Sequence, residues 1–215
     1  MFTGIVEDIG SVRTIRKLPG KWEFFLSTHL DPRGINDGDS IAVDGVCLTV
    51  TRQEGTDIIA DVSLETLAVT TLKDKEPGDR VNLELAMRAD SRFGGHMVLG
   101  HIDGIGRILE LAAAGDSIRL EIEVSPEVIR YIVKKGSVAI DGTSLTVNDL
   151  HDRRFTLNII PFSSSRTTLG FKGLGDYVNV ETDVVARYIE RFVGPREREG
   201  VDLDFLYKYG YIKGR

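Results

Sequence analysis

The chain has 215 residues but only one cysteine, one tryptophan and four histidines. The single Cys47 excludes an internal disulfide and is typical of a protein from a reducing compartment. Basic residues are outnumbered, with 27 lysines and arginines against 33 acidic residues and a formal net charge of −6. This balance argues against nucleic acid and against an anionic membrane as partners, because both favour basic faces.

Long apolar runs and standard catalytic motifs are also missing. No stretch is long enough to span a membrane, and residues 1–4 lack the charged and apolar pattern of a signal peptide, so we expect a cytoplasmic protein. Gly-x-Ser-x-Gly, Cys-x-x-Cys and the phosphate-binding Gly-rich loop do not occur. His96 and His101, five residues apart, do not have a metal-ligand spacing, and we expect no metal site.

An internal repeat is the strongest feature that is present. Residues 40–50, SIAVDGVCLTV, recur as SVAIDGTSLTV at 137–147, with seven of eleven positions identical. Each copy reads as a strand, an Asp-Gly turn and a second strand, which is typical of a β-hairpin. Two further blocks repeat at nearly the same offset: GIVEDIGSV (4–12) with GHIDGIGRI (100–108), and GDRVNLE (78–84) with GDYVNVE (175–181). One hairpin alone would be only a well-formed turn, but three aligned blocks indicate a duplicated domain.

The repeat predicts an all-β-dominated fold of two tandem small antiparallel Greek-key β-barrels, related by a pseudo-twofold axis, plus a C-terminal helix. We expect strands at 2–15, 21–27, 57–62 and 80–86 in the first copy, and a short helical segment at 63–72. The predicted domains are residues 1–93 and 94–182, two barrels, and 183–215, a helical segment. Only the second copy has a helix signal, from Ser125-Pro126 to Gly136, with an apolar face formed by Val128, Ile129 and Ile132.

The last segment predicts an amphipathic helix with one apolar stripe: Val184, Val185, Tyr188, Ile189 and Phe192. An apolar tail follows at residues 201–211. A short terminal helix needs a surface to cover its apolar face. This favours oligomerisation over docking on the chain's own barrels.

Candidate functional residues are polar groups at matching positions of the two copies. Cys47 and Thr49 match Ser144 and Thr146, while Ile5 in the first copy matches His101 in the second. Lys135 directly precedes the second hairpin, and Glu65-Thr66 matches Phe162-Ser163. Each residue also has a structural explanation, such as a strand Thr, a small core Cys, a surface His or a Lys at a helix end. Their alignment by the repeat is what favours a duplicated site.

These motifs resemble those of a known family. The N-terminal MFTGIVEDIG, the two (V/I)DG-x-(C/S)-LTV hairpins, GGHMVLGHIDG at the start of the second half and the helical tail are similar to the riboflavin synthase family, alpha-chain type. The resemblance covers essentially the whole chain. It implies a cofactor-free dismutation in which two molecules of 6,7-dimethyl-8-ribityllumazine exchange a four-carbon unit, giving riboflavin and 5-amino-6-ribitylamino-uracil. It also implies a homotrimer formed through the C-terminal helices, and it leaves lumazine synthase open as a further protein partner.

The resemblance implies a site between the N-terminal barrel of one subunit and the C-terminal barrel of its neighbour. In the first half-site it places Gly4, Ile5, Val6, Cys47, Leu48, Thr49, Asp61, Val62, Ser63, Leu64, Glu65 and Thr66. In the second it places Gly100, His101, Ile102, Lys135, Ser144, Leu145, Thr146, Ile159, Ile160, Pro161, Phe162, Ser163 and Ser164. As general acid/base, proton relay or nucleophile we expect His101, Ser144, Thr146 and Cys47.

One segment departs from the family. The family has Pro-Glu-Thr-Leu in the second half, which residues 64–67 nearly preserve in the first half, whereas this chain has Pro161, Phe162, Ser163 and Ser164. The family's polar contacts at that corner of the second barrel therefore do not carry over directly.

Two other functional classes fit a double barrel. Lumazine proteins share it and bind a lumazine or flavin without catalysis, but His101, Ser144 and Cys47 together favour an enzyme. A nucleic-acid-binding barrel is disfavoured by the acidic charge and by the few aromatic residues available for base stacking.

Overall fold

The computed structural model describes residues 1–193, 206 and 209–211. Met1–Val184 form one compact unit and Val185–Arg215 a second. Most of the predicted apolar tail, residues 201–211, lies outside the described residues.

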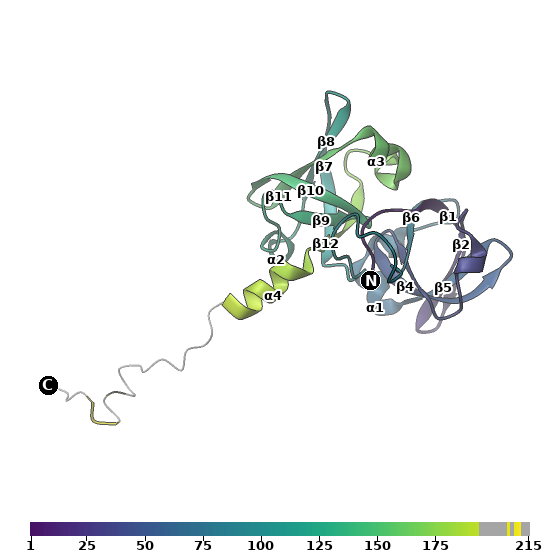
Figure 1. Ribbon diagram of the computed structural model, residues 1–215, viewed down its shortest axis with the longest axis horizontal. Coiled ribbons are helices and arrows are strands. Elements are labelled where there is room, and N and C mark those ends of the chain that lie inside the picture. The colour runs from purple at the N-terminus through teal and green to yellow at the C-terminus, as the bar shows by residue number, and fades with distance from the viewer. Residues whose placement is uncertain (194–205, 207–208, 212–215) are drawn as a thin grey trace. The chain divides into compact units, whose positions relative to one another are not determined.

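The first half of the chain closes into a six-stranded antiparallel barrel (Figure 1). Its strands are β1 (Asp8–Leu18), β2 (Lys21–Ser27), β3 (Ser40–Val43), β4 (Val46–Glu54), β5 (Asp57–Ser63) and β6 (Arg80–Leu85). Around the barrel they follow the order β1-β2-β5-β4-β3-β6. The connections carry η1 (Pro32–Gly34), α1 (Leu64–Val69) and η2 (Thr71–Asp74).

The second half repeats this topology. Its strands are β7 (Gly104–Ala114), β8 (Ser117–Glu123), β9 (Ser137–Ile140), β10 (Thr143–His151), β11 (Arg154–Ile159) and β12 (Tyr177–Thr182), in the equivalent circular order β7-β8-β11-β10-β9-β12. The connections carry α2 (Pro126–Ile129), α3 (Pro161–Arg166) and η3 (Thr168–Phe171). Even the register shifts repeat, between Val12 and Thr14 in β1 and between Ile108 and Glu110 in β7. The predicted double barrel is confirmed.

Two elements differ from the sequence prediction. The first strand begins at Asp8 rather than at residue 2, because the preceding residues run along the other barrel and Phe2 pairs with Val98. The helix expected up to Gly136 is a single turn, α2, although Val128 and Ile132 are buried in the second barrel's core as its apolar face required. The prediction was right about the buried face and wrong about the length.

The two Asp-Gly turns of the repeat meet back to back. Asp44 and Gly45 have φ of 45° and 79°, and Asp141 and Gly142 have 43° and 78°, as a two-residue type I′ hairpin requires. A Cβ added to Gly45 would lie 2.6 Å from the backbone N of Gly142, and one added to Gly142 would lie 2.8 Å from that of Gly45. Glycine is therefore needed twice over, for its φ and for the close approach of two backbones.

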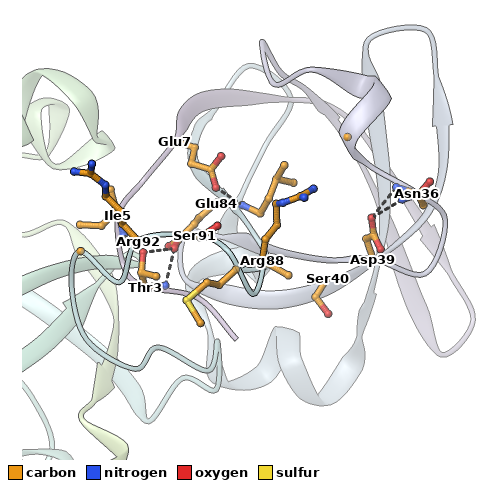
Figure 2. Close-up of a pocket in the computed structure, with 15 residues that line it drawn as sticks. Thr3, Ile5, Glu7, Asn36, Asp39, Ser40, Glu84, Arg88, Ser91 and Arg92 are labelled. Carbon is orange, nitrogen blue, oxygen red and sulfur yellow. Dashed lines mark hydrogen bonds between the residues drawn. The ribbon is translucent and has the colours of Figure 1, made fainter.

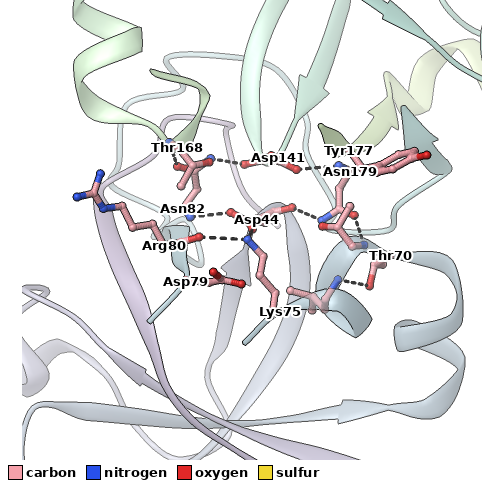
Figure 3. A network of polar contacts seen from close by, with 12 residues as sticks. Asp44, Thr70, Lys75, Asp79, Arg80, Asn82, Asp141, Thr168, Tyr177 and Asn179 are labelled. Carbon is pink, nitrogen blue, oxygen red and sulfur yellow. Dashed lines mark hydrogen bonds and ion pairs between the residues drawn. The ribbon is translucent and has the colours of Figure 1, made fainter. Parts of the chain in front are cut away.

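A buried polar network holds the turns in register (Figure 3). The Asn82 side chain donates to the carbonyl of Asp141 at 2.7 Å, and Asn179 donates to that of Asp44 at 2.9 Å. Lys75 pairs with the Asp44 carboxylate at 2.7 Å, and Lys172 with that of Asp141 at 3.0 Å. Burial raises the pKa of Asp141 to about 6, although Lys172 acts to lower it.

The C-terminal helix α4 (Val184–Val193) has the predicted amphipathic pattern, and none of its residues is buried. Its stripe leaves Tyr188, Ile189 and Phe192 exposed. Among the described residues no helix has both the length and the apolar character needed to cross a bilayer.

Candidate active site

The outer face of the first barrel carries a row of mostly polar residues on β4, β5 and the start of α1, called here the first ledge: Cys47, Thr49, Asp61, Ser63 and Glu65. Cys47 and Thr49 are two residues apart on β4, and their side chains point outward while that of Leu48 points inward. Thr49 lies opposite Asp61 of β5. Asp61 is bonded to the ammonium group of Lys21 at 2.6 Å. At the end of β5 the Ser63 hydroxyl caps α1 by accepting from the backbone N of Thr66 at 3.0 Å. Leu64 and Glu65 lie exposed in the first turn of this helix.

The second barrel has an equivalent ledge with different chemistry. Ser144 and Thr146 alternate outward along β10, with Ser144 half-buried and Thr146 exposed. After β11, Ile160 precedes α3 without a side chain that caps the helix, Pro161 begins the helix, and Phe162 is exposed. Ser163 and Ser164 follow it half-buried.

Lys135 occupies the left-handed region, with φ of 66°. Its backbone N donates to the carbonyl of Val147 at 2.8 Å, just as that of Gly38 donates to Val50 in the first barrel. A lysine here carries a backbone cost that glycine avoids, of order 1 kcal/mol or more. At this position the second barrel therefore has a more strained backbone than the first barrel, which has Gly38.

Four of the predicted site residues have side chains that point inward. Leu48 and Val62 belong to the core of the first barrel, and Leu145 and Ile159 to that of the second. These positions can offer a ligand only their backbone groups.

The segment that precedes each barrel in the chain lies against the other barrel. The backbone N of Ser144 in the second barrel donates to the carbonyl of Gly4 at 2.8 Å, and that of Cys47 in the first donates to Gly100 at 2.9 Å. Ile102 packs against the core of the first barrel. A Cβ on Gly4 would lie 2.7 Å from the Ser144 Cβ, and one on Gly100 2.4 Å from the Cys47 Cβ. Both glycines are thus required by contact with the opposite barrel.

This exchange corrects the grouping expected from the resemblance. Gly4 was assigned to the half-site of Cys47, and Gly100 to that of Ser144. The backbone hydrogen bonds place each glycine against the ledge of the other copy. The segment of His101 therefore lies along the first barrel, and that of Ile5 along the second.

Two buried carboxylates hold the exchanged segments. Glu84 accepts from the backbone N of Thr3 at 2.6 Å and from that of Gly4 at 3.1 Å. Glu181 accepts from Leu99 at 2.7 Å and from Gly100 at 2.9 Å. Burial raises the pKa of Glu181 to about 7, although these amides act to lower it.

Comparison with known proteins identifies the family. The pattern of the lumazine binding domain matches twice, at residues 3–86 and 99–183. The riboflavin synthase of Actinobacillus pleuropneumoniae is 44% identical over 98% of this chain and 100% of its own length. That of Mycobacterium tuberculosis is 42% identical over 90% of this chain and 98% of its own. This chain belongs to the riboflavin synthase family.

Solved structures share the fold of this chain as well. The crystal structure of LumP complexed with riboflavin has a TM-score of 0.79 and is 27% identical, covering 85% of this chain and 99% of LumP. LumP complexed with 6,7-dimethyl-8-(1'-D-ribityl)lumazine has a TM-score of 0.76 with the same coverage. Each of the two matched domains corresponds to one barrel of this chain.

Sequence reasoning missed one residue of the second ledge. The sequence indicates no role for His96 beyond the excluded metal site, but its Nδ1 lies 2.8 Å from the Ser144 Oγ. Burial lowers the pKa of His96, while the charge of Asp183 acts to raise it. The available signal was the Gly94-Gly95 pair before His96, which marks a close approach of the backbone to another element.

A separate pocket of about 560 Å³ lies at the edge of the first barrel (Figure 2). It runs from Ile5 and Arg92 to Asn36 and Asp39, with Glu84 among the lining residues. Of the predicted site residues only Ile5 lines it. The two ledges are therefore outside this pocket, and they carry the matched polar groups.

Proposed function

We propose that this chain is an enzyme that forms riboflavin from two molecules of 6,7-dimethyl-8-ribityllumazine, releasing 5-amino-6-ribitylamino-uracil. No cofactor is needed in this reaction, because one lumazine donates a four-carbon unit and the other accepts it. Membership of the riboflavin synthase family supports the assignment. Two copies of one binding domain suit a reaction that joins two copies of one substrate.

The observation that carries the proposal is the pair of equivalent but chemically different ledges. Each has an outward Thr, Thr49 or Thr146, and each is closed by the leading segment of the other copy. They differ at Cys47 against Ser144 and at Glu65 against Phe162. Equivalent ledges supply two places for one kind of ring, and their differences supply the asymmetry between donor and acceptor.

The residues that act on the substrate are part of the proposal. Backbone amides beside the strand edges bind the pyrimidine-dione ring, and Thr49, Thr146 and Lys135 take ribityl hydroxyls. The nucleophile and the proton-transfer groups come from Cys47, Ser144, Thr146 and His101. Binding both rings against each other turns a bimolecular encounter into an effectively unimolecular step.

We also propose a homotrimer, with the complete site formed by the first barrel (residues 1–93) of one subunit and the second barrel (94–182) of another. The exposed stripe of Tyr188, Ile189 and Phe192 in the segment 183–215 supports self-association. A cytoplasmic location rests on the lone Cys47, and lumazine synthase stays an open candidate for a protein partner.

The decisive experiment is incubation of the purified full chain with 6,7-dimethyl-8-ribityllumazine alone. We expect riboflavin absorbance to appear with one riboflavin formed for every two lumazines consumed. Separation of the products should show 5-amino-6-ribitylamino-uracil in equal amount.

A second candidate function is binding of a lumazine or flavin without catalysis, and the close structural similarity to LumP favours it. In the same assay this protein would quench or shift the lumazine fluorescence while the lumazine concentration stayed constant. Tight binding without turnover would contradict the enzyme and establish the binding protein.

A further inference from the structure

An imidazole lies beside the hydroxyl of the second ledge. His96 Nδ1 is 2.8 Å from the Ser144 Oγ, and His96 is only 7% exposed. Its backbone N donates to the Thr3 carbonyl at 3.1 Å, and Thr3 is itself bonded to Glu84. The ring is thus anchored through a segment that is fixed to the first barrel.

The backbone before His96 is built for this approach. A Cβ on Gly95 would lie 2.0 Å from the Thr3 carbonyl oxygen and 3.0 Å from the Ser144 Cβ. Any residue other than glycine would push the chain away from Ser144. Gly95 therefore allows the His96 ring to lie beside the Ser144 hydroxyl.

The direction of the hydrogen bond between His96 and Ser144 depends on the protonation and tautomer of the ring. Burial lowers the pKa of His96 and the charge of Asp183 partly opposes this, so the ring is neutral near pH 7. A neutral imidazole has one donor and one acceptor nitrogen. The buried Nε2 has no hydrogen-bond partner among the described residues, so the side chain's bond is the one to Ser144.

On the basis of the proposed function, we propose that His96 is a positioning residue for Ser144. Its Nδ1 accepts a hydrogen bond from the Ser144 hydroxyl and thereby turns the lone pairs of Oγ toward the bound lumazine. Cys47, the equivalent residue of the first ledge, has no such bond to an imidazole in the described part of the chain. The second half-site therefore holds a side chain, Ser144, that an imidazole orients, whereas Cys47 of the first half-site is not oriented in this way by any described residue.

The test compares His96→Leu with His96→Asn, since the Asn amide oxygen can accept a hydrogen bond close to the position of Nδ1. We expect His96→Leu to lower kcat about 10- to 100-fold, as loss of orientation does, with KM within about threefold. His96→Asn should recover most of that loss. Its rate should also lose the acid limb of the wild-type pH profile, because protonation of His96 makes Nδ1 a donor and reverses the bond.

A double-mutant cycle with Ser144→Ala asks whether His96 acts through Ser144. If it does, His96→Leu adds little to the loss already caused by Ser144→Ala. Equal losses in both backgrounds would overturn the proposal, and so would an unchanged kcat in His96→Leu. His151→Asn, at an exposed histidine on the same barrel, is the matched control and should leave kcat unchanged.

An activity-independent measurement separates this inference from the proposed function. Nitrogen NMR of the wild-type imidazole near pH 7 should show a protonated Nε2 and an acceptor Nδ1, whose shift changes in Ser144→Ala. An Nδ1–H tautomer would overturn the positioning role even if riboflavin forms. A wild-type chain that forms no riboflavin contradicts the proposed function, whatever the tautomer. If His96→Leu does not fold, the pH profile of His96→Asn and the tautomer decide.

Discussion

Among individual residues, the repeat identifies those that lie on equivalent strands but not His96, which lies between the two barrels. The repeat matched Cys47 and Thr49 with Ser144 and Thr146, and each pair lies on the outward face of its own strand, β4 or β10. His96 has no such pattern, because its contact with Ser144 depends on a backbone path between two barrels. Periodicity reports local orientation, whereas contacts across a domain interface leave only indirect signs such as paired glycines.

His101 gives a prediction at this scale. With Gly100 bonded to Cys47, the imidazole belongs to the segment along the first barrel, where the second has Ile5. We expect His101→Ile to slow the saturated rate by about 10² to 10⁴, as loss of a general acid/base does, with lumazine affinity nearly unchanged. Steady-state rates and equilibrium titration measure the two effects.

Ile5→His is the matching control and should not restore the rate in His101→Ile, because it places the imidazole along the opposite barrel. If His101→Ile weakened binding strongly at an unchanged saturated rate, His101 would be a binding residue only.

Glu181 predicts a pH-dependent stability. Its folded pKa of about 7 exceeds the usual 4.5, so the folded chain binds this proton more tightly than the unfolded chain does. The free energy of unfolding therefore rises as the pH falls from about 8 to 5, by about 2 to 3 kcal/mol from this residue. In Glu181→Gln this contribution disappears, which urea unfolding across that pH range measures.

Glu84→Gln serves as the comparison, because burial also raises the pKa of Glu84 and it holds the equivalent segment. The same pH slope in wild type and Glu181→Gln would show that Glu181 does not titrate in this range.

At the scale of elements, strands were predicted well and short helices less well. The bounds of β2 and the two Asp-Gly hairpins follow from alternation and turn chemistry, which act locally. The start of β1 and the length of α2 do not, because tertiary contacts end these elements. The contacts of Gly4 and Gly100 with the opposite barrel were likewise hidden, since the repeat pairs the two segments without indicating which barrel each one contacts.

The stacked hairpins predict an unequal cost for two glycine substitutions. Gly45 has φ of 79° and meets Gly142, whereas Gly55 has φ of 65° with open space around it. We expect Gly55→Ala to cost about 1 kcal/mol of backbone strain, and Gly45→Ala to cost about 1 to 3 kcal/mol more through overpacking. Urea unfolding of both variants measures the difference. Equal losses would mean that the two turns separate without cost.

At the scale of the molecule, the sequence predicted the duplication, which the structure confirms, and self-association through the C-terminal segment, which stays a prediction. Barrel topology follows from the strands of one chain, whereas the proposed site between subunits would depend on surfaces that the sequence does not pair. The exposed Tyr188, Ile189 and Phe192 of α4 are the feature that points beyond one chain.

Deleting Val185–Arg215, the second compact unit, should therefore give monomers with little riboflavin formation. The deletion keeps Asp183, so the charge that acts on His96 is retained. Light scattering gives the mass and lumazine consumption gives the rate. The pair Ile189→Asp and Phe192→Asp should have the same effect without shortening the chain. A fully active monomer would contradict a site shared between subunits.

The exchanged segments also constrain how the chain is made. During synthesis the edge at Cys47 has no partner until Gly100 emerges, and Gly4 has none until Ser144 follows. At roughly 5 to 20 residues per second the N-terminal segment waits on the order of ten seconds for its strand. Until Gly100 emerges, the backbone N of Cys47 lacks this partner, and the same segment of a second nascent chain can supply it, so we expect crowded translation of one messenger to yield chains paired through exchanged segments.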